Sequence, residues 1–209
     1  MANICFFDME VLGKKEDIDR LIEIMKYNDP VFYICRVREV YVEHEDDFKD
    51  VHHVQLMGEA AWSLYDWYDH TMEIDYKDGT LCTNLIFLSE HLHLSIEVFG
   101  ECDEDGFNQH MAFKNGEVLV HEACDKTEPW YEVGDDTIDD VIEEIKEDAE
   151  EWDLSDDEME SLVKEVRPIL EKYKEVSVKF GGYDWDYNLE RLYEGKCIPW
   201  KIEKYCVIS

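Results

Sequence analysis

The stretch LSIEVFGECDEDGFNQHMAFKNGEVLVHEA, residues 94–123, decides the expected fold. Its first residues alternate apolar and polar side chains, as in a strand with one buried face. The turn signal DEDG at residues 103–106 leads into a second strand. Asn115 and Gly116 both tolerate the positive φ angles of a type I′ turn, so they predict a hairpin within residues 110–123. The stretch therefore predicts an antiparallel sheet.

The chain before this stretch is expected to hold three strands and two helices. Residues 3–13 alternate imperfectly and predict a strand, and residues 14–27 carry apolar side chains at helical spacing. Residues 31–43 and 53–62 are rich in β-branched and aromatic residues and predict strands, with EHEDDFKD as a charged connector between them. Leucines at helical spacing predict a second helix within residues 80–93.

Two acidic helices are expected after a boundary near residues 129–134. Apolar residues from 138 to 152 follow helical spacing and predict the first helix. Ser155 and Glu158 form a capping-box pair, in which each side chain satisfies a free backbone donor, and they predict the start of the second. Pro168 is expected to kink or restart this second helix, because proline cannot donate the helical hydrogen bond.

The end of the chain predicts one more strand and a tail. Residues 176–180 have a strand composition, two glycines follow, and residues 183–205 are rich in aromatic side chains. We therefore divide the chain into an α+β domain, residues 1–130, and an acidic helical extension, residues 131–209. The aromatic tail of this extension is expected to pack back on the body.

Composition limits the classes of partner. The formal net charge of −33 disfavours direct binding to nucleic acid phosphates or anionic lipid and favours basic partners or cations. No secretory leader and no apolar run long enough to span a membrane are evident, which predicts a cytoplasmic protein without membrane contact. The seven cysteines form an odd set without close pairs and are expected to be reduced.

Three stretches together resemble a known family. They are the strand-helix opening with Gly13, the segment GEAAWSLYDWY at residues 58–68, and LSIEVFGECDEDGFNQHMAFKNGE at residues 94–117. They resemble the YubB-type ferredoxin-like domain, which occurs in uncharacterised proteins of bacteria, plasmids, phages and mobile elements. The resemblance covers roughly the first 125 residues. It implies an α+β fold, with a ferredoxin-like antiparallel sheet and helices on one face, followed here by the C-terminal acidic helices. It implies no activity, because a fold alone does not give a function.

An aromatic cleft is one candidate site. Trp62, Trp67, Phe107 and His110 could line it, with Glu97 at its edge. In that case the protein would be a small enzyme, a hydrolase or a transferase. The alternative is that these aromatic side chains form the core and that the nearby glycine serves a turn. No nucleophile motif or phosphate-binding glycine loop is present, so we assign no catalytic residue.

The histidines were considered as metal ligands. The candidates are His52 with His53, His91 with His93, His110, and His121 with Cys124. Zinc sites usually show paired ligands at short spacing, and the sequence has neither CxxC nor HExxH. We therefore predict neither a metal site nor a cofactor.

The acidic stretch at residues 135–161 is the second candidate site. It holds fifteen acidic residues and one basic residue, Lys146. Eight acids cover the outer side of the first helix and are called the acidic stripe: Asp136, Asp139, Asp140, Glu143, Glu144, Glu147, Asp148 and Glu151. Like charges four residues apart destabilise a helix, and one lysine cannot offset them. This local cost indicates a use for the stripe, although a merely solvated helix face is the alternative.

Two partners suit the acidic stripe. Carboxylates one helical turn apart are about 5 Å from each other, which is close to the repeat of charge along a nucleic acid strand. The stripe could therefore compete for a nucleic-acid-binding protein, as an inhibitor from a mobile element would. It could also dock on any basic protein surface and steer association by charge. Both interpretations predict a non-catalytic binding protein.

Overall fold

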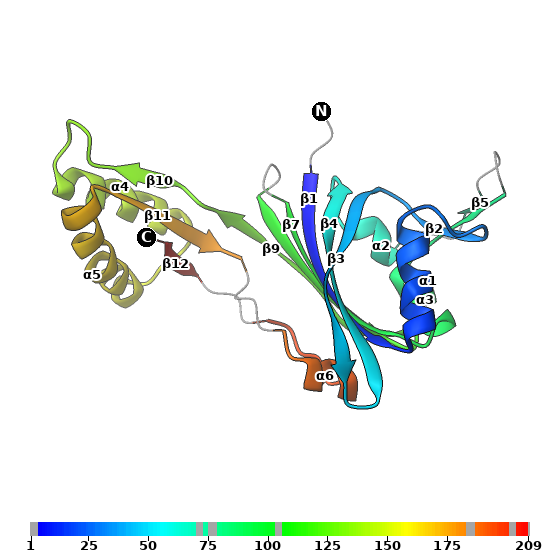
Figure 1. Ribbon diagram of the computed structural model, residues 1–209. Coiled ribbons are helices and arrows are strands. Elements are labelled where there is room, and N and C mark those ends of the chain that lie inside the picture. The colour runs from blue at the N-terminus through cyan, green and yellow to red at the C-terminus, as the bar shows by residue number, and fades with distance from the viewer. Residues whose placement is uncertain are drawn as a thin grey trace. The chain divides into compact units, whose positions relative to one another are not determined.

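A computed structural model of the chain describes residues 4–69, 73–74, 79–102, 106–182, 187–200 and 204–208. The chain divides into two compact units. The first comprises residues 1–123 and 185–200, and the second comprises residues 124–184 and 201–209. The division therefore falls a few residues before the predicted boundary at residue 130. The aromatic tail is shared, because residues 187–200 return to the first unit (Figure 1).

The large sheet is antiparallel. The first unit contributes β1 (Ile4–Gly13), β3 (Val37–Phe48), β4 (Val51–Ala61), β7 (Ser95–Cys102), β8 (Phe107–Lys114) and most of β9 (Glu117–Thr127). The second unit contributes β10 (Trp130–Glu132), β11 (Glu175–Gly181) and β12 (Tyr205–Ile208). These nine strands follow the order β10-β11-β9-β8-β7-β1-β4-β3, and β12 also pairs with β11. Three short strands, β2 (Phe32–Ile34), β5 (Glu73–Ile74) and β6 (Leu81–Thr83), form a separate sheet.

The helices are divided between the two units. The first unit holds α1 (Lys15–Met25), α2 (Tyr65–Asp69), α3 (Leu85–His91) and α6 (Leu189–Glu194). The second unit holds α4 (Ile138–Glu151) and α5 (Asp156–Tyr173). Several local predictions are confirmed: α1, α4 and α5 form where apolar spacing predicted them. Asn115 and Gly116 adopt φ angles of 48° and 84° in the predicted hairpin turn.

The ferredoxin-like fold with helices on one face is wrong. The sheet has nine strands, and in the first unit helices cover both of its faces. α1 and α3 pack on one face, whereas α6 contacts β1 and β7 from the other (Figure 1). One cause is the segment EHEDDFKD, which was expected to be a connector but continues β3 to Phe48. β3 ends the strand order, and charged side chains are typical of an edge strand because they oppose further pairing.

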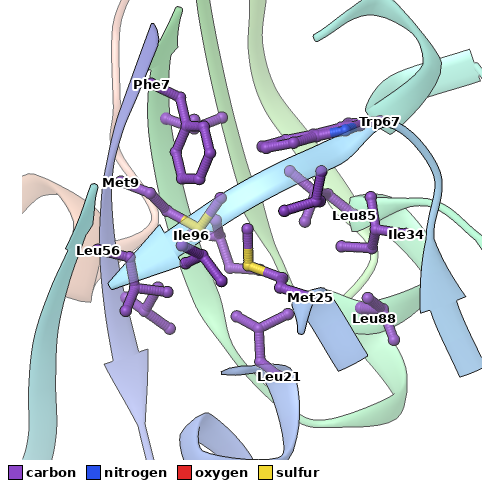
Figure 2. Packing of buried hydrophobic residues seen from close by; sticks show 14 of the residues in the cluster. Phe7, Met9, Leu21, Met25, Ile34, Leu56, Trp67, Leu85, Leu88 and Ile96 are labelled. Atoms are coloured by element: carbon purple, nitrogen blue, oxygen red, sulfur yellow. The ribbon is translucent and has the colours of Figure 1, made fainter. Parts of the chain in front are cut away.

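The core of the first unit lies between the sheet and the helices α1 and α3. Alternation along β1 turns Phe7, Met9 and Val11 into this core, where they are nearly inaccessible to solvent. Figure 2 shows Leu21 and Met25 of α1 in the same cluster as Phe7 and Met9, with Trp67 beside Phe7 at one end. The same alternation turns Asp8 and Glu10 to the opposite face of the sheet.

The second unit has a separate core. Its buried side chains come from α4, α5 and β11, with Tyr131 from β10. Both helices begin with capping boxes: the predicted one at Ser155 and Glu158, and one at Thr137 and Asp140 that the sequence analysis missed. Pro168 lies inside α5, which continues without a restart from residue 156 to 173.

The capping box of α5 gives a pH-dependent prediction. Hydrogen bonds from Ser155, followed by Lys204, lower the pKa of Glu158 from its ordinary 4.5 to about 2. Since the folded-state pKa is depressed, the stabilising contribution is fully present above pH 4.5 and is lost as the pH falls toward 2. Ser155→Ala removes the N-cap of α5, a change that typically lowers the free energy of unfolding by about 0.5–2 kcal/mol. The part of this loss that depends on the Glu158 carboxylate should disappear in acid.

Urea denaturation at a series of pH values measures this difference. The control is Ser161→Ala, in the same helix but away from its start, which should change stability little because alanine favours a helix interior. A difference between native protein and Ser155→Ala that stays constant down to about pH 2 would contradict the linkage to Glu158.

Two expectations about the chain as a whole have different outcomes. Cys5 on β1 and Cys102 on β7 form a disulfide, so the expectation of reduced cysteines fails for this pair. Cys35 and Cys197 are not part of a disulfide among the described residues. Among the described residues, none of the helices combines the length and the apolar character that crossing a membrane requires.

Candidate functional site

Seven residues of the acidic stripe lie on the outer side of α4, and the eighth, Asp136, immediately precedes the N-cap Thr137. The inner side of the helix buries Val141, Ile142, Ile145 and Ala149 in the core of the second unit. Seven of the eight stripe residues are exposed, and Asp148 is half-buried. The spacing of apolar residues thus predicted correctly which side of the helix faces solvent.

Two members of the acidic stripe stabilise the fold through uncharged partners. The carboxylate of Asp140 accepts hydrogen bonds from the backbone N–H of Thr137, at 2.9 Å, and from its hydroxyl, at 2.6 Å. The O–H of Tyr131 donates to Asp148 at 2.6 Å. Burial, followed by this hydrogen bond, raises the pKa of Tyr131 well above its ordinary value, so the phenol keeps its proton and remains a donor.

Two further members are held by cations. Arg167 of α5 donates to Asp139 at 2.8 Å, and Lys146 donates to Glu143 at 2.7 Å. Both ion pairs are exposed, and such pairs contribute little to stability because solvent screens them. They do, however, neutralise part of the charge on the outer side of α4.

The other four stripe carboxylates have no such role. Asp136, Glu144, Glu147 and Glu151 are exposed and have no ion-pair partner among the described residues. The last turn of α4 contains no basic residue, so Glu151 lies at the end of the helix where the dipole disfavours negative charge. Glu144, Glu147 and Glu151 carry charge that costs the helix stability, and Asp136 lies just before its first turn. None of the four has an ion-pair partner in the described part of the chain.

The second unit also has an apolar hollow. Its volume is about 270 Å³, and it is lined by Trp130, Ile169, Tyr173, Glu175, Val176 and Ile208. Trp130 is 62% exposed and Tyr173 is 54% exposed, although both have large apolar rings. Aromatic side chains beside a hollow are typical of the anchor points of protein interfaces. Sequence analysis missed this feature, because its lining comes from four separate elements.

The predicted aromatic cleft is not assembled as one site. Trp67 is fully buried in the core, with its ring edge-on to Phe7 at 4.9 Å and its indole N–H donating to the carbonyl of Cys35 at 3.0 Å. Trp62 is 50% exposed, and Phe107 packs against the core. The interpretation of the aromatic residues as core therefore describes Trp67 and Phe107.

Glu97 and His110 do lie together, on the opposite face of the sheet from Trp67. A carboxylate oxygen of Glu97 is 2.8 Å from Nε2 of His110, and both side chains are buried. The indole ring of Trp200 stacks on the imidazole with 3.8 Å between the ring centroids, and its backbone N–H donates to Nδ1 at 3.4 Å. A substrate could reach His110 on this face only by displacing Trp200.

The same sheet face carries other buried polar groups. Gln55 donates to both carboxylate oxygens of Asp8, at 3.0 and 3.1 Å, and burial raises the pKa of Asp8. The O–H of Tyr187 donates to the backbone carbonyl of Asp8 at 2.8 Å. Burial, reinforced by the charges of Asp8 and other carboxylates, raises the pKa of Tyr187 far above its ordinary value. This face is a polar layer covered by residues 187–200.

A cluster of histidine and aspartate side chains near the end of β3 and the start of β4 is absent from the sequence-based predictions. His44 and Asp46 are two residues apart on β3, so their side chains lie on the same side of the strand. His53 on β4 lies directly opposite Asp46 in the sheet register. The ring of His53 is bonded to Asp46 through Nδ1, at 2.6 Å, and to Glu10 through Nε2. The spacing His-x-Asp within a strand could have revealed the cluster, but this segment was interpreted as a connector.

Comparisons with known proteins add no relative. No family model matches the sequence, and neither a curated protein nor a solved structure matches the chain. The resemblance to the YubB-type family therefore stays a prediction.

Proposed function

We propose that the protein is a non-catalytic, cytoplasmic binding protein that docks on a basic surface of another protein. One observation carries the proposal: Glu144, Glu147 and Glu151 form a row of exposed carboxylates on α4, Asp136 lies exposed just before the helix, and none of the four has a cation partner among the described residues. A partner that supplies lysine or arginine side chains would remove the repulsion along this helix. Binding would therefore recover the free energy that like-charge repulsion costs the isolated helix.

Charge and apolar contact have different parts in such binding. The net charge of −33 would speed the encounter with a basic partner and make its rate sensitive to salt. Charge alone gives limited affinity, because exposed ion pairs are weak. The apolar hollow beside Trp130 and Tyr173 supports the proposal, since it offers an aromatic anchor in the same unit.

A nucleic-acid-binding protein is the partner class that we propose. Successive turns of α4 place carboxylates about 5.4 Å apart along the helix axis, and one strand of DNA presents a phosphate about every 3.4 Å along its axis. The two spacings are of the same order, so a surface built for phosphates could accept the stripe. The resemblance to mobile-element proteins supports this class, because an inhibitor would act there by mimicry.

A variant with four neutralised carboxylates tests the proposal. Asp136→Asn, Glu144→Gln, Glu147→Gln and Glu151→Gln together should abolish the capture of a basic partner from a bacterial lysate. The native protein should capture it at low salt and lose it at high salt. Added DNA should displace the partner if the stripe mimics nucleic acid. The variant should also be slightly more stable, by a few tenths of a kcal/mol for each repulsive pair removed.

A matched variant controls for total charge. Glu117→Asn, Asp153→Asn, Asp157→Asn and Glu171→Gln together remove the same charge from exposed positions outside α4. This variant should capture the partner as the native protein does. The proposal fails if the α4 variant captures the same proteins as the native chain, if the two variants lose binding equally, or if the native chain captures no basic protein.

A further inference from the structure

We propose that His44, Asp46 and His53 bind one divalent transition-metal ion, with Zn²⁺ as the ion that fits best. The three side chains offer two imidazole nitrogens and one carboxylate oxygen, and these donor atoms all lie within 4.8 Å of one another. Two histidines and one carboxylate are a known ligand set of catalytic zinc sites. Imidazole nitrogen favours zinc and its neighbours over Mg²⁺ and Ca²⁺, which prefer oxygen alone.

The backbone brings the three residues together. The ladder between β3 and β4 shifts register between Val42 and His44, immediately before the cluster. Such an irregularity adds a residue to one strand and re-aims the side chains that follow it. After the shift, His44 and Asp46 share one side of β3, and Asp46 is paired with His53 across the ladder. Two adjacent strands of a rigid sheet therefore hold all three ligands.

The separations between the donor atoms suit a small ion. Nε2 of His44 is 3.3 Å from one carboxylate oxygen of Asp46, and Nδ1 of His53 is 2.6 Å from the other. In a tetrahedral site with zinc bonds of about 2.0–2.1 Å, the distance between two ligand atoms is slightly longer than these two contacts. It is also well below 4.8 Å, the limit within which all the donor atoms here lie of one another. His44 and Asp46 are exposed, so their side chains can adjust, whereas His53 is buried and fixed.

Glu10 acts as a positioning residue for His53. Its carboxylate is bonded to Nε2 of His53, which turns Nδ1 toward Asp46 and His44. Metal-binding histidines commonly donate their second ring nitrogen to a carboxylate, which fixes the ring and strengthens the ligand. Binding would replace a proton on Nδ1 by the metal ion, and the proton would leave to solvent.

The neighbouring His52, in the same hairpin, contacts two carboxylates and serves as a comparison. Its ring nitrogens contact Asp47 at 3.1 Å and Glu45 at 3.0 Å, but among the described residues no second histidine joins this group. The cluster at His53 differs because a second imidazole, that of His44, contacts the same carboxylate, that of Asp46. Three protein ligands leave at least one position on the ion open to water or to another ligand.

Titration with Co²⁺, which replaces zinc and absorbs visible light when bound tetrahedrally, tests the site in the full chain. Excess Mg²⁺ should be present to occupy the many exposed carboxylates. The native protein should bind one equivalent of Co²⁺ with a tetrahedral spectrum, and Zn²⁺ should displace it. His44→Ala should weaken binding by at least about 10- to 100-fold, the loss typical of even an outer-shell change.

Two more variants complete the test. His52→Ala, the matched control, should bind Co²⁺ as the native protein does. Glu10→Gln should weaken binding less than His44→Ala does, because it acts through His53. Circular dichroism should show that His44→Ala folds, as expected for an exposed side chain. The proposal is overturned if Mg²⁺ suppresses all Co²⁺ binding, if His44→Ala binds like the native protein, or if His52→Ala weakens binding as much.

Discussion

Trp67→Ala should lower the free energy of unfolding by about 3–5 kcal/mol, the range for a buried tryptophan that leaves a cavity. The indole is fully buried, packs edge-on against Phe7, and donates to the carbonyl of Cys35. The substitution removes apolar burial and leaves that carbonyl without its donor, and both effects act in the same direction. Urea denaturation followed by circular dichroism measures the loss.

Trp62→Ala is the matched control, because the same residue type lies five positions earlier and is 50% exposed. Its effect should stay within about 0.5 kcal/mol, as for most surface positions. Equal losses for the two variants would mean that Trp67 is not the closing residue of the core in the first unit.

Glu97→Ala should also lower the free energy of unfolding, by about 1–3 kcal/mol, the cost of leaving a buried hydrogen-bonding group without its partner. The variant leaves His110 buried beneath Trp200 without its carboxylate. The paired variant Glu97→Leu with His110→Leu should lose less than the sum of the two single changes, because neither side chain is left without the other and only the backbone N–H of Trp200 loses its acceptor.

A double-mutant cycle by denaturation measures this coupling. Glu117→Ala, at an exposed position of β9, gives the baseline for losing a carboxylate from the same sheet. Additive losses in the cycle would show that Glu97 and His110 act independently, contrary to their 2.8 Å contact.

Local patterns predicted much of the secondary structure. The spacing of Val141, Ile142 and Ile145 correctly predicted α4 and its buried side, and Asn115 with Gly116 correctly predicted the hairpin. The sheet was predicted less well, because strand pairing joins residues far apart in the chain. β1 lies between β4 and β7, and no local pattern specifies those neighbours. The strand predicted within residues 31–43 ends before the edge strand β3 does, because the charged end of β3 has the composition of a loop.

The candidate sites divide in the same way. The acidic stripe follows from helical periodicity alone, so the sequence placed seven of its eight residues correctly on α4, whereas Asp136 precedes the helix. The sequence does not show which of these carboxylates have partners within the protein. Asp139 accepts a hydrogen bond from Arg167, twenty-eight residues away, and Asp148 accepts one from Tyr131 on β10. The capping box at Thr137 and Asp140 was readable locally and was overlooked. The bond between Glu10 and His53 spans forty-three positions and was not readable.

The first unit is discontinuous in the sequence, and this has a consequence for how it is made. Residues 187–200 supply Trp200 and Tyr187, which cover the polar layer at His110 and Asp8. A ribosome must therefore translate the whole second unit up to residue 184 before it delivers the segment that seals the first. During that interval the nascent sheet holds its carboxylates and imidazoles open to water, where they need no partner. We expect the last step of folding to be the arrival of this segment, rather than the formation of the sheet.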